Sequence, residues 1–352
     1  MLLYIHIPFC DSKCFYCAFN SYTSMHSLRD DYMRSLLVQL EDGLKKNDKK
    51  VETIFIGGGT PSTIKASKYK EVMDLVRPYI VENCEITIEA NPNSASKEWL
   101  EEIYKLGINR VSFGVQSFDD EKLKFLGRNH KKSQAIDAIN NAKKAGFENI
   151  NCDIIYDTKL DTKELLRNDL RIIKNLPINH ISAYSLTIEE GTKFFNQKNV
   201  QFENEELARF LFNEFEKLGF GQYEISNFAL NENGRSKHNL GYWKYKEYLG
   251  VGSGAVGCIG NKRYYAKKDL EAYIKDPLEY DEIELLTKDD VLVEKVLLGF
   301  RSVVGVNIDD FNIEQHKKVE ILLSESKIQK IDNHIYANDF MLADELSLFL
   351  DI

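Results

Sequence analysis

The chain has 352 residues, which at ~150 residues per domain corresponds to about two domains, or to one barrel with an appendage. Apolar residues make up 43% and charged residues 29%, with six prolines and no biased tract, which argues against a disordered or collagen-like chain. The 46 basic and 55 acidic side chains give a net charge of -9, which argues against nucleic-acid binding and favours a soluble protein. No apolar stretch approaches the ~18 residues of a membrane-spanning helix.

The start of the chain carries no targeting pattern. Residues 1–13 lack a basic segment and reach a proline at Pro8, so we predict neither a signal peptide nor a transit sequence. We therefore expect a cytoplasmic protein, in which free thiolates bind metal more often than they form disulfides. Whether the chain forms a homodimer is left open.

Short β-type runs alternate with amphipathic helical runs as far as about residue 190, which is typical of βα units and a parallel sheet. Six strands are predicted, at 2–7, 51–56, 85–90, 110–115, 150–156 and 180–186. Apolar residues at helical spacing predict helices at 33–44, 69–79, 99–106 and 135–145, the last ending at Gly146. Six βα units indicate an α/β fold, a partial (β/α)6 TIM-like barrel with its site at the carboxyl ends of the strands.

The chain after residue 190 is less regular. We expect residues 191–285 to extend the barrel, with a helix at 205–218 and a glycine-rich segment at 250–257. Helices at 291–300 and 314–323 and a hairpin at 327–336 predict a small helical, winged-helix-like module. The predicted divisions are therefore 1–190, 191–285 and 286–352.

The six cysteines fall into two groups. Cys10, Cys14 and Cys17 lie within eight positions, directly after the first predicted strand. The others lie in strand-like segments and are predicted to be small buried apolar side chains: Cys84, Cys152 and Cys258.

The first group is predicted to bind metal. A structural zinc site normally takes four protein ligands, often as two pairs, and no second pair exists here. Three unligated thiols on one loop would be an oxidation hazard. A [4Fe-4S] cluster can be held by three thiolates, which leaves one iron open to another ligand, so Cys10, Cys14 and Cys17 suit such a cluster better than a structural zinc ion.

The spacing Cys10-x3-Cys14-x2-Cys17, with Tyr16 before the last cysteine, resembles the cluster motif of the radical S-adenosylmethionine superfamily. Further segments are similar to the coproporphyrinogen-dehydrogenase-like branch: YIHIPFC at 4–10, GGGTPS at 57–62, EANP at 89–92, RVSFGVQSF at 110–118 and LGRNH at 126–130. The resemblance implies that the reduced cluster donates an electron to bound S-adenosylmethionine, which releases methionine and a 5′-deoxyadenosyl radical.

The residues in these segments also suit a cofactor by themselves. The glycines at 57–59 let the backbone approach a bound molecule, and Glu89 can accept hydrogen bonds from a ribose. Gln116 and Asp153 are polar residues within apolar runs and need partners. Arg128 either pairs with the carboxylate of the cofactor or belongs to a solvated basic run. The resemblance implies the following contacts with S-adenosylmethionine: Tyr4, Tyr16, Gly58, Gly59, Thr60, Glu89, Gln116, Arg128 and Asp153.

The segment HNLGYW at 238–243 is similar to a motif of heme chaperones related to this branch. An imidazole is a common axial ligand of heme iron, and aromatic rings can flank a macrocycle. Without the resemblance, His238 would be interpreted as a hydrogen-bonded or surface histidine. The resemblance implies heme contacts by His238, Asn239, Tyr242 and Trp243. The segments at 184–192 and 223–229 fit the same branch.

Two functions are weighed within the branch. Its oxygen-independent coproporphyrinogen III oxidases carry a fourth cysteine two positions after the third and a longer amino-terminal segment, whereas this chain has Phe19 there and nine residues before Cys10. We therefore predict a heme chaperone that binds a [4Fe-4S] cluster, S-adenosylmethionine and heme, and transfers heme to an unidentified hemoprotein acceptor. An oxidase of porphyrin biosynthesis stays the alternative, and no catalytic residue is assigned.

One loop departs from the family pattern. Relatives usually follow the fifth strand with a Gly-Leu-Pro-Gly type loop, whereas this chain reads DTKLD at 157–161. That loop adjoins the expected cofactor, so the resemblance supports cluster binding more firmly than cleavage of S-adenosylmethionine.

Overall fold

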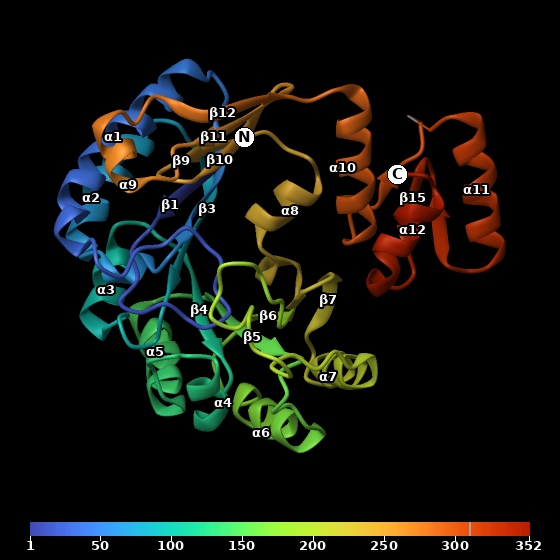
Figure 1. Cartoon of the computed structure of the whole chain (residues 1–352), viewed down its shortest axis with the longest axis horizontal. Helices are drawn as coiled ribbons and strands as arrows, with labels where there is room; N and C mark the ends of the chain where they lie inside the picture. Colours follow the sequence, from blue (N-terminus) through green and yellow to red (C-terminus); the bar gives the residue numbers. More distant parts are fainter. Residues whose placement is uncertain (310) are drawn as a thin grey trace.

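The computed structural model describes residues 1–309 and 311–352. The centre of its main sheet consists of β1 (Leu2–Ile7), β2 (Val51–Gly58), β3 (Ile80–Ala90), β4 (Arg110–Gln116), β5 (Asn149–Tyr156) and β6 (His180–Ser185). Each of these strands pairs in parallel with the next one in the chain. The six predicted strands are thus confirmed, and together they form the curved wall in Figure 1.

Helices between these strands cover the outer face of the sheet (Figure 1). They are α1 (Arg29–Lys46), α2 (Tyr69–Val76), α3 (Lys97–Lys105), α4 (Asp120–Phe125), α5 (Lys132–Ala145) and α6 (Lys163–Ile173). The four predicted helices correspond to α1, α2, α3 and α5, and α5 ends at Gly146 as expected. Their buried faces and the outward side chains of the strands form one large apolar core. The prediction missed α4 and α6.

The sheet continues beyond both edges of its parallel centre. Next to β1 lies β9 (Tyr248–Val251), which is parallel to it, followed by antiparallel β10 (Val256–Ile259), β11 (Lys262–Ala266) and β12 (Tyr280–Leu285). Next to β6 lie antiparallel β8 (Asn227–Ala229) and β7 (Gly221–Glu224). Within the described ranges β12 and β7 do not pair with each other, so the barrel is partial, as predicted.

Three further helices accompany this extension: α7 (Glu205–Lys217), α8 (Lys237–Trp243) and α9 (Leu270–Lys275). The predicted helix at 205–218 is therefore present as α7. Short 3₁₀ helices lie at His26–Leu28, Pro61–Thr63, Ala66–Lys68, Glu232–Gly234 and Phe340–Leu342. In the residues that the structure describes, no helix combines the length and the apolar character needed to cross a membrane.

The end of the chain forms a small unit beside the barrel (Figure 1). It contains α10 (Lys288–Phe300), α11 (Ile313–Ser324), α12 (Ala343–Phe349) and a sheet of β13 (Val306–Asn307), β14 (Ile328–Ile331) and β15 (His334–Ala337). Its side chains pack into an apolar core of their own. The predicted helices and hairpin are present, while the boundaries at residues 190 and 286 stay predictions.

The inner face of the parallel strands is polar, which is unusual because a sheet covered on both faces normally carries apolar runs. In β4, Val111, Phe113 and Val115 join the outer core, whereas the alternate residues Arg110 and Ser112 face the barrel interior. Polar side chains in a barrel interior need partners, so this face indicates a binding site.

Candidate cofactor site inside the barrel

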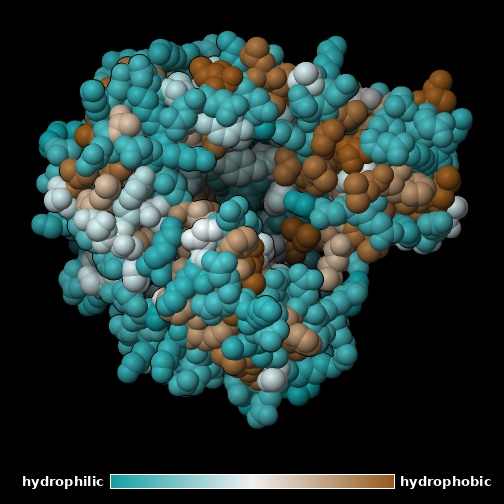
Figure 2. Space-filling model, in the orientation of Figure 1, coloured by the Kyte–Doolittle hydropathy of each residue, from teal (hydrophilic) through white to brown (hydrophobic). Residues whose placement is uncertain are grey.

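A cavity of about 560 Å³ occupies the barrel interior. Figure 2 shows this face of the molecule hollowed near its middle, beside apolar side chains that gather over α10. The cavity is lined by most of the predicted site residues: Cys10, Cys14, Cys17, Tyr16, Gly58, Gly59, Thr60, Glu89, Gln116, Arg128, Asp153 and Asn239. Four others do not line it: Tyr4, His238, Tyr242 and Trp243.

The three clustered cysteines lie on the loop after β1 as free thiols. Cys10 Sγ is 3.3 Å from Thr60 Oγ1, and Arg128 Nη1 donates a hydrogen bond of 3.2 Å to Cys14 Sγ. Among the described residues, no three His, Cys, Asp or Glu side chains lie close enough to hold a single metal ion. Each thiolate of a [4Fe-4S] cluster binds a different iron, so a cluster does not require the three thiols to meet at one ion.

The cysteine loop is held by contacts that involve no thiol. Phe15 N donates to Leu126 O at 3.1 Å, and Phe194 N donates to Phe15 O at 2.9 Å. The rings of Phe15 and Phe194 meet edge to face with centroids 5.8 Å apart, at the margin of a small apolar cluster. A side chain at Gly127 would collide with the Phe15 ring. Apolar packing and backbone hydrogen bonds therefore both hold the loop.

The glycine-rich turn after β2 is clamped to the cysteine loop. Thr60 N donates to Phe9 O at 2.8 Å. A Cβ at Gly59 would lie 2.8 Å from Phe9 O and 2.9 Å from Ile7 O, so no side chain fits there. Gly59 thus lies against the backbone of the cysteine loop, while the predicted approach of these glycines to a bound molecule stays a prediction.

Two carboxyl groups face the cavity from neighbouring strands. Glu89 Oε2 accepts a hydrogen bond of 3.0 Å from Gly58 N, and Asp153 Oδ1 accepts one of 2.6 Å from Asn151 Nδ2. Burial, and then the charge of Asp153, raise the pKa of Glu89 to about 8. Burial also raises the pKa of Asp153, against hydrogen bonds from Asn151 and Ser182 that lower it. Glu89 is consequently protonated at neutral pH.

Replacing Glu89 by Gln is expected to flatten the pH dependence of stability. The folded pKa of about 8 exceeds the unfolded value of ~4.3, so the folded chain binds more protons between these values and loses stability as pH rises through this range. Between about pH 5 and about pH 9, the melting temperature of Glu89→Gln should fall less than that of the wild type. Equal falls in both proteins would contradict the raised pKa.

Arg128 is tied to the cavity wall. Besides its bond to Cys14, its Nη2 donates to Asn91 Oδ1 at 2.6 Å and to Gly114 O. Its Nε is buried without a hydrogen-bond partner. The alternative of a solvated basic run is therefore wrong for this guanidinium, which brings positive charge beside Cys14.

Gln116, at the end of β4, has a φ of 72° and also lines the cavity.

The segment HNLGYW forms α8, which closes the inner end of the barrel. Both Lys237 N and His238 N donate to the Glu85 carboxylate at 3.0 Å. The His238 side chain is 1% exposed, and its Nδ1 lies 2.8 Å from Thr53 Oγ1. Its ring centroid is 5.2 Å from that of Phe55. His238 thus seals the barrel rather than facing the cavity.

The histidine is nevertheless in the form that binds metals. Burial, and then the charge of Arg110, lower the pKa of His238 to about 3, so the imidazole is neutral. His238 Nε2 and Trp243 Nε1 are buried without partners. The Tyr242 ring meets that of His238 edge to face at 4.8 Å. A heme contact by this imidazole would require α8 to move.

Tyr4 lies behind the cavity wall. Its hydroxyl is 2.9 Å from His6 Nδ1, and its ring stacks on that of Phe55 at 6.3 Å. Its contact with a cofactor stays a prediction.

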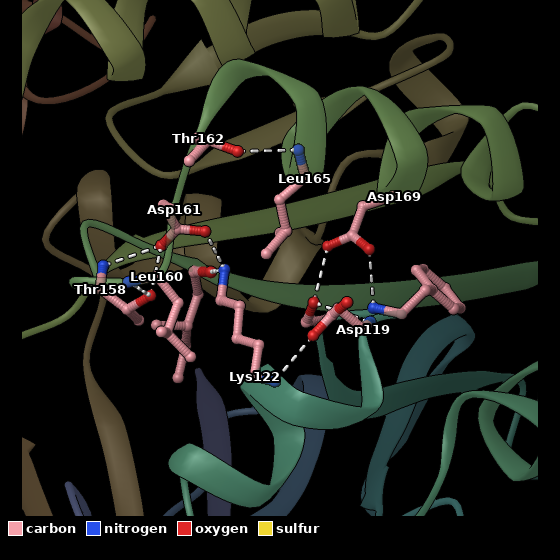
Figure 3. A network of polar contacts seen from close by, with 11 residues as sticks. Asp119, Lys122, Thr158, Leu160, Asp161, Thr162, Leu165 and Asp169 are labelled. Carbon is pink, nitrogen blue, oxygen red and sulfur yellow. Dashed lines mark hydrogen bonds and ion pairs between the residues drawn. The ribbon is translucent and has the colours of Figure 1, made fainter.

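The loop that departs from the family pattern is fixed by a buried ion pair (Figure 3). Lys122 of α4 is fully buried, pairs with Asp161 and donates to Ile155 O at 2.7 Å. The other oxygen of Asp161 accepts from Thr158 N and Oγ1, both at 2.8 Å. Asp157 adopts a φ of 63°, a conformation that usually favours glycine. The loop at 157–161 is thus held by hydrogen bonds and an ion pair, at a position where relatives usually have glycines.

A second buried acid in Figure 3 holds the neighbouring strand end. Asp169 of α6 accepts hydrogen bonds from Ser117 Oγ at 2.8 Å and from Phe118 N at 2.9 Å. Burial raises its pKa to about 6, against the charge of Lys122, which lowers it. The two helices that sequence reasoning missed therefore position the ends of β4 and β5. The one sequence signal was the unusual loop at 157–161.

Comparisons with known proteins agree with this arrangement. Residues 4–185 match the family model described as the radical SAM superfamily. The chain is 33% identical to the heme chaperone HemW of Lactococcus lactis, over 96% of this chain and 90% of that protein. It is 38% identical to HemW of Escherichia coli over 73% of this chain and 70% of that protein.

A solved structure shares the fold. The E. coli coproporphyrinogen III oxidase HemN, described as a radical SAM enzyme, superposes with a TM-score of 0.82. The superposition covers 99% of this chain and 89% of HemN at 20% sequence identity. At this identity the likeness concerns the fold alone.

Proposed function

Because the chain belongs to the radical SAM superfamily, and within it to the family of the heme chaperone HemW, we propose that it binds a [4Fe-4S] cluster, S-adenosylmethionine and heme, and transfers heme to a hemoprotein. The observation that supports this most directly is the set of three free cysteines on one cavity wall. Three free thiols persist in a reducing compartment, so we place this activity in the cytoplasm. The acceptor and a homodimer stay predictions.

The residues present fit an iron-sulfur cluster. Cys10, Cys14 and Cys17 would supply three thiolates and leave one iron open, and the Arg128 guanidinium donates a hydrogen bond to Cys14 Sγ. When bound, the cluster supplies an electron to the sulfonium of S-adenosylmethionine.

The other cavity residues suit the rest of S-adenosylmethionine. Protonated Glu89 holds its proton at a carboxyl oxygen and can donate it in a hydrogen bond, while Asp153 and Gln116 add further polar contacts. The buried Nε of Arg128 offers a donor that no protein group uses. These side chains orient a polar ligand beside the thiols.

The heme part of the proposal rests on the names of the relatives and on the segment HNLGYW. His238 is the proposed axial ligand, since its imidazole is neutral and its Nε2 has no partner. Because Phe55 and Tyr242 enclose the ring, we propose that α8 moves when heme binds.

Hemin added to the anaerobically reconstituted protein is expected to shift the Soret band and to saturate at about one heme per chain. His238→Ala should weaken this binding at least about tenfold, because the iron loses its axial imidazole. His334→Ala, which removes a half-buried imidazole from β15, is the matched control and should titrate like the wild type. No spectral change with the wild type would remove the heme proposal, and wild-type binding by His238→Ala would remove the ligand assignment.

The oxidase alternative has its own test. The reconstituted protein is incubated without oxygen with coproporphyrinogen III, a reductant and S-adenosylmethionine. We expect no turnover. More than one protoporphyrinogen formed per chain would overturn a function limited to heme transfer.

A further inference from the structure

The inner part of the cavity holds an arginine that forms no ion pair with the described residues. Arg110, the first residue of β4, is 3% exposed and lines the cavity. In the part of the chain that the structure describes, it makes no ion pair, and its Nε has no hydrogen-bond partner. A buried charge without a partner is strongly unfavourable and is retained where something compensates for it.

The nearby carboxyl groups accept hydrogen bonds from other partners. Both oxygens of Glu85 accept backbone N–H groups at the start of α8. Glu89 accepts from Gly58 N, and Asp153 accepts from Asn151. The charge of Arg110 acts to lower the pKa of Glu89 and of Asp153, but among the described residues neither group forms an ion pair with it.

Other unsatisfied polar atoms lie near the guanidinium. Thr87 of β3 is the cross-strand neighbour of Arg110, and its Oγ1 is buried without a partner. His238 Nε2 is also buried without a partner, and the charge of Arg110 acts on this imidazole. A guanidinium and a hydroxyl both donate hydrogen bonds. Such a set of donors is complementary to an anion.

We infer that the inner end of the cavity binds a carboxylate group of a ligand, with Arg110 as its main partner. Arg110 matches a carboxylate because a guanidinium can donate two parallel hydrogen bonds to it. The inference rests on the proposed function and specifies a ligand group for it. S-adenosylmethionine carries a methionyl carboxylate and heme carries propionates, whereas neither contains a phosphate.

A ligand-binding role and a structural role for Arg110 predict opposite effects on stability. Arg110→Met removes a buried charge without breaking a hydrogen bond or ion pair of the described residues, so the ligand-free variant should melt at or above the wild-type temperature. A structural arginine would lower the melting temperature when replaced. Arg110→Lys keeps the charge but loses the planar fork, and should fold normally while binding more weakly.

The test measures affinities of the full chain for two pairs of ligands: S-adenosylmethionine and its decarboxylated analogue, and hemin and its dimethyl ester. In one of the two pairs, the wild type should bind the ligand that carries the carboxylate at least about tenfold more tightly than its partner without one. Arg110→Met should bind the carboxylate-bearing ligand more weakly and the other ligand unchanged, so that the preference is lost. The pair that responds identifies the methionyl or the propionate carboxylate. Arg171→Met, which removes an exposed arginine of α6, is the control and should behave like the wild type.

A simple carboxylate separates this inference from the proposed function. Propionate, compared with chloride at equal ionic strength, should raise the melting temperature of the wild type but not that of Arg110→Met. This result would support the carboxylate site even if the wild type bound neither hemin nor S-adenosylmethionine. Failure to bind those two ligands would contradict the proposed function but not the carboxylate site. The inference is overturned if propionate stabilises both proteins equally, if Arg110→Met keeps wild-type preference for the acids, or if it melts clearly below the wild type.

Discussion

Replacing Cys14 by Ser is expected to reduce the iron content of the reconstituted protein from about four irons per chain to nearly none. Cys14 is the middle ligand of the three and the one whose Sγ accepts a hydrogen bond from Arg128. A hydroxyl is a much poorer ligand than a thiolate for cluster iron, so the remaining two cysteines should not retain the cluster. Iron and sulfide assays, together with the visible absorbance of the cluster, measure the effect.

The matched control for this substitution is Cys258→Ala. Cys258 lies on β10, is buried and does not line the cavity, so this variant should keep the wild-type iron content. Wild-type iron content in Cys14→Ser, or an equal loss in both variants, would contradict the assignment of the cluster to the loop after β1.

Lys122→Met is expected to lower the free energy of unfolding by about 3–5 kcal/mol, because it leaves the Asp161 carboxylate buried without its cation. Urea denaturation of the ligand-free protein measures this change. Adding Asp161→Asn removes the uncompensated charge and keeps an oxygen that can accept from Thr158, so the double variant should recover much of the loss.

An exposed ion pair of the neighbouring helix provides the control. Lys163 and Glu206 pair on the surface with side chains 45% and 80% exposed, so Lys163→Met should cost less than about 1 kcal/mol. The same small cost for Lys122→Met would show that the pair with Asp161 does not hold the loop. A single and a double variant of equal stability would instead show that the lysine acts through its bond to Ile155 O.

The strands were predictable because their sequence pattern reflects their burial. Residues 110–115 alternate between side chains of the outer core, such as Val111 and Phe113, and polar side chains of the interior. The cysteine cluster was equally visible, since its three ligands lie within one short loop. A strand or a three-cysteine loop can be predicted because the residues that define it are close together in the sequence.

The features that the sequence analysis missed depend on contacts between distant residues. Lys122 and Asp161 resemble ordinary surface charges, and only the packing of α4 against the loop after β5 buries them. The enclosed position of His238 depends on Thr53, Phe55 and Glu85, which lie far away in the chain. The missing partner of Arg110 is likewise a property of its three-dimensional surroundings.

The packing of Phe15 against Phe194 and Leu126 affects how the protein acquires and loses its metal. Many small metal sites exist only in the metal-bound chain, so that chelators unfold them. Here the loop has its shape through apolar contacts and backbone hydrogen bonds. Because these contacts involve no thiol, we expect removal of the cluster to leave the barrel folded, with its cysteine loop in place.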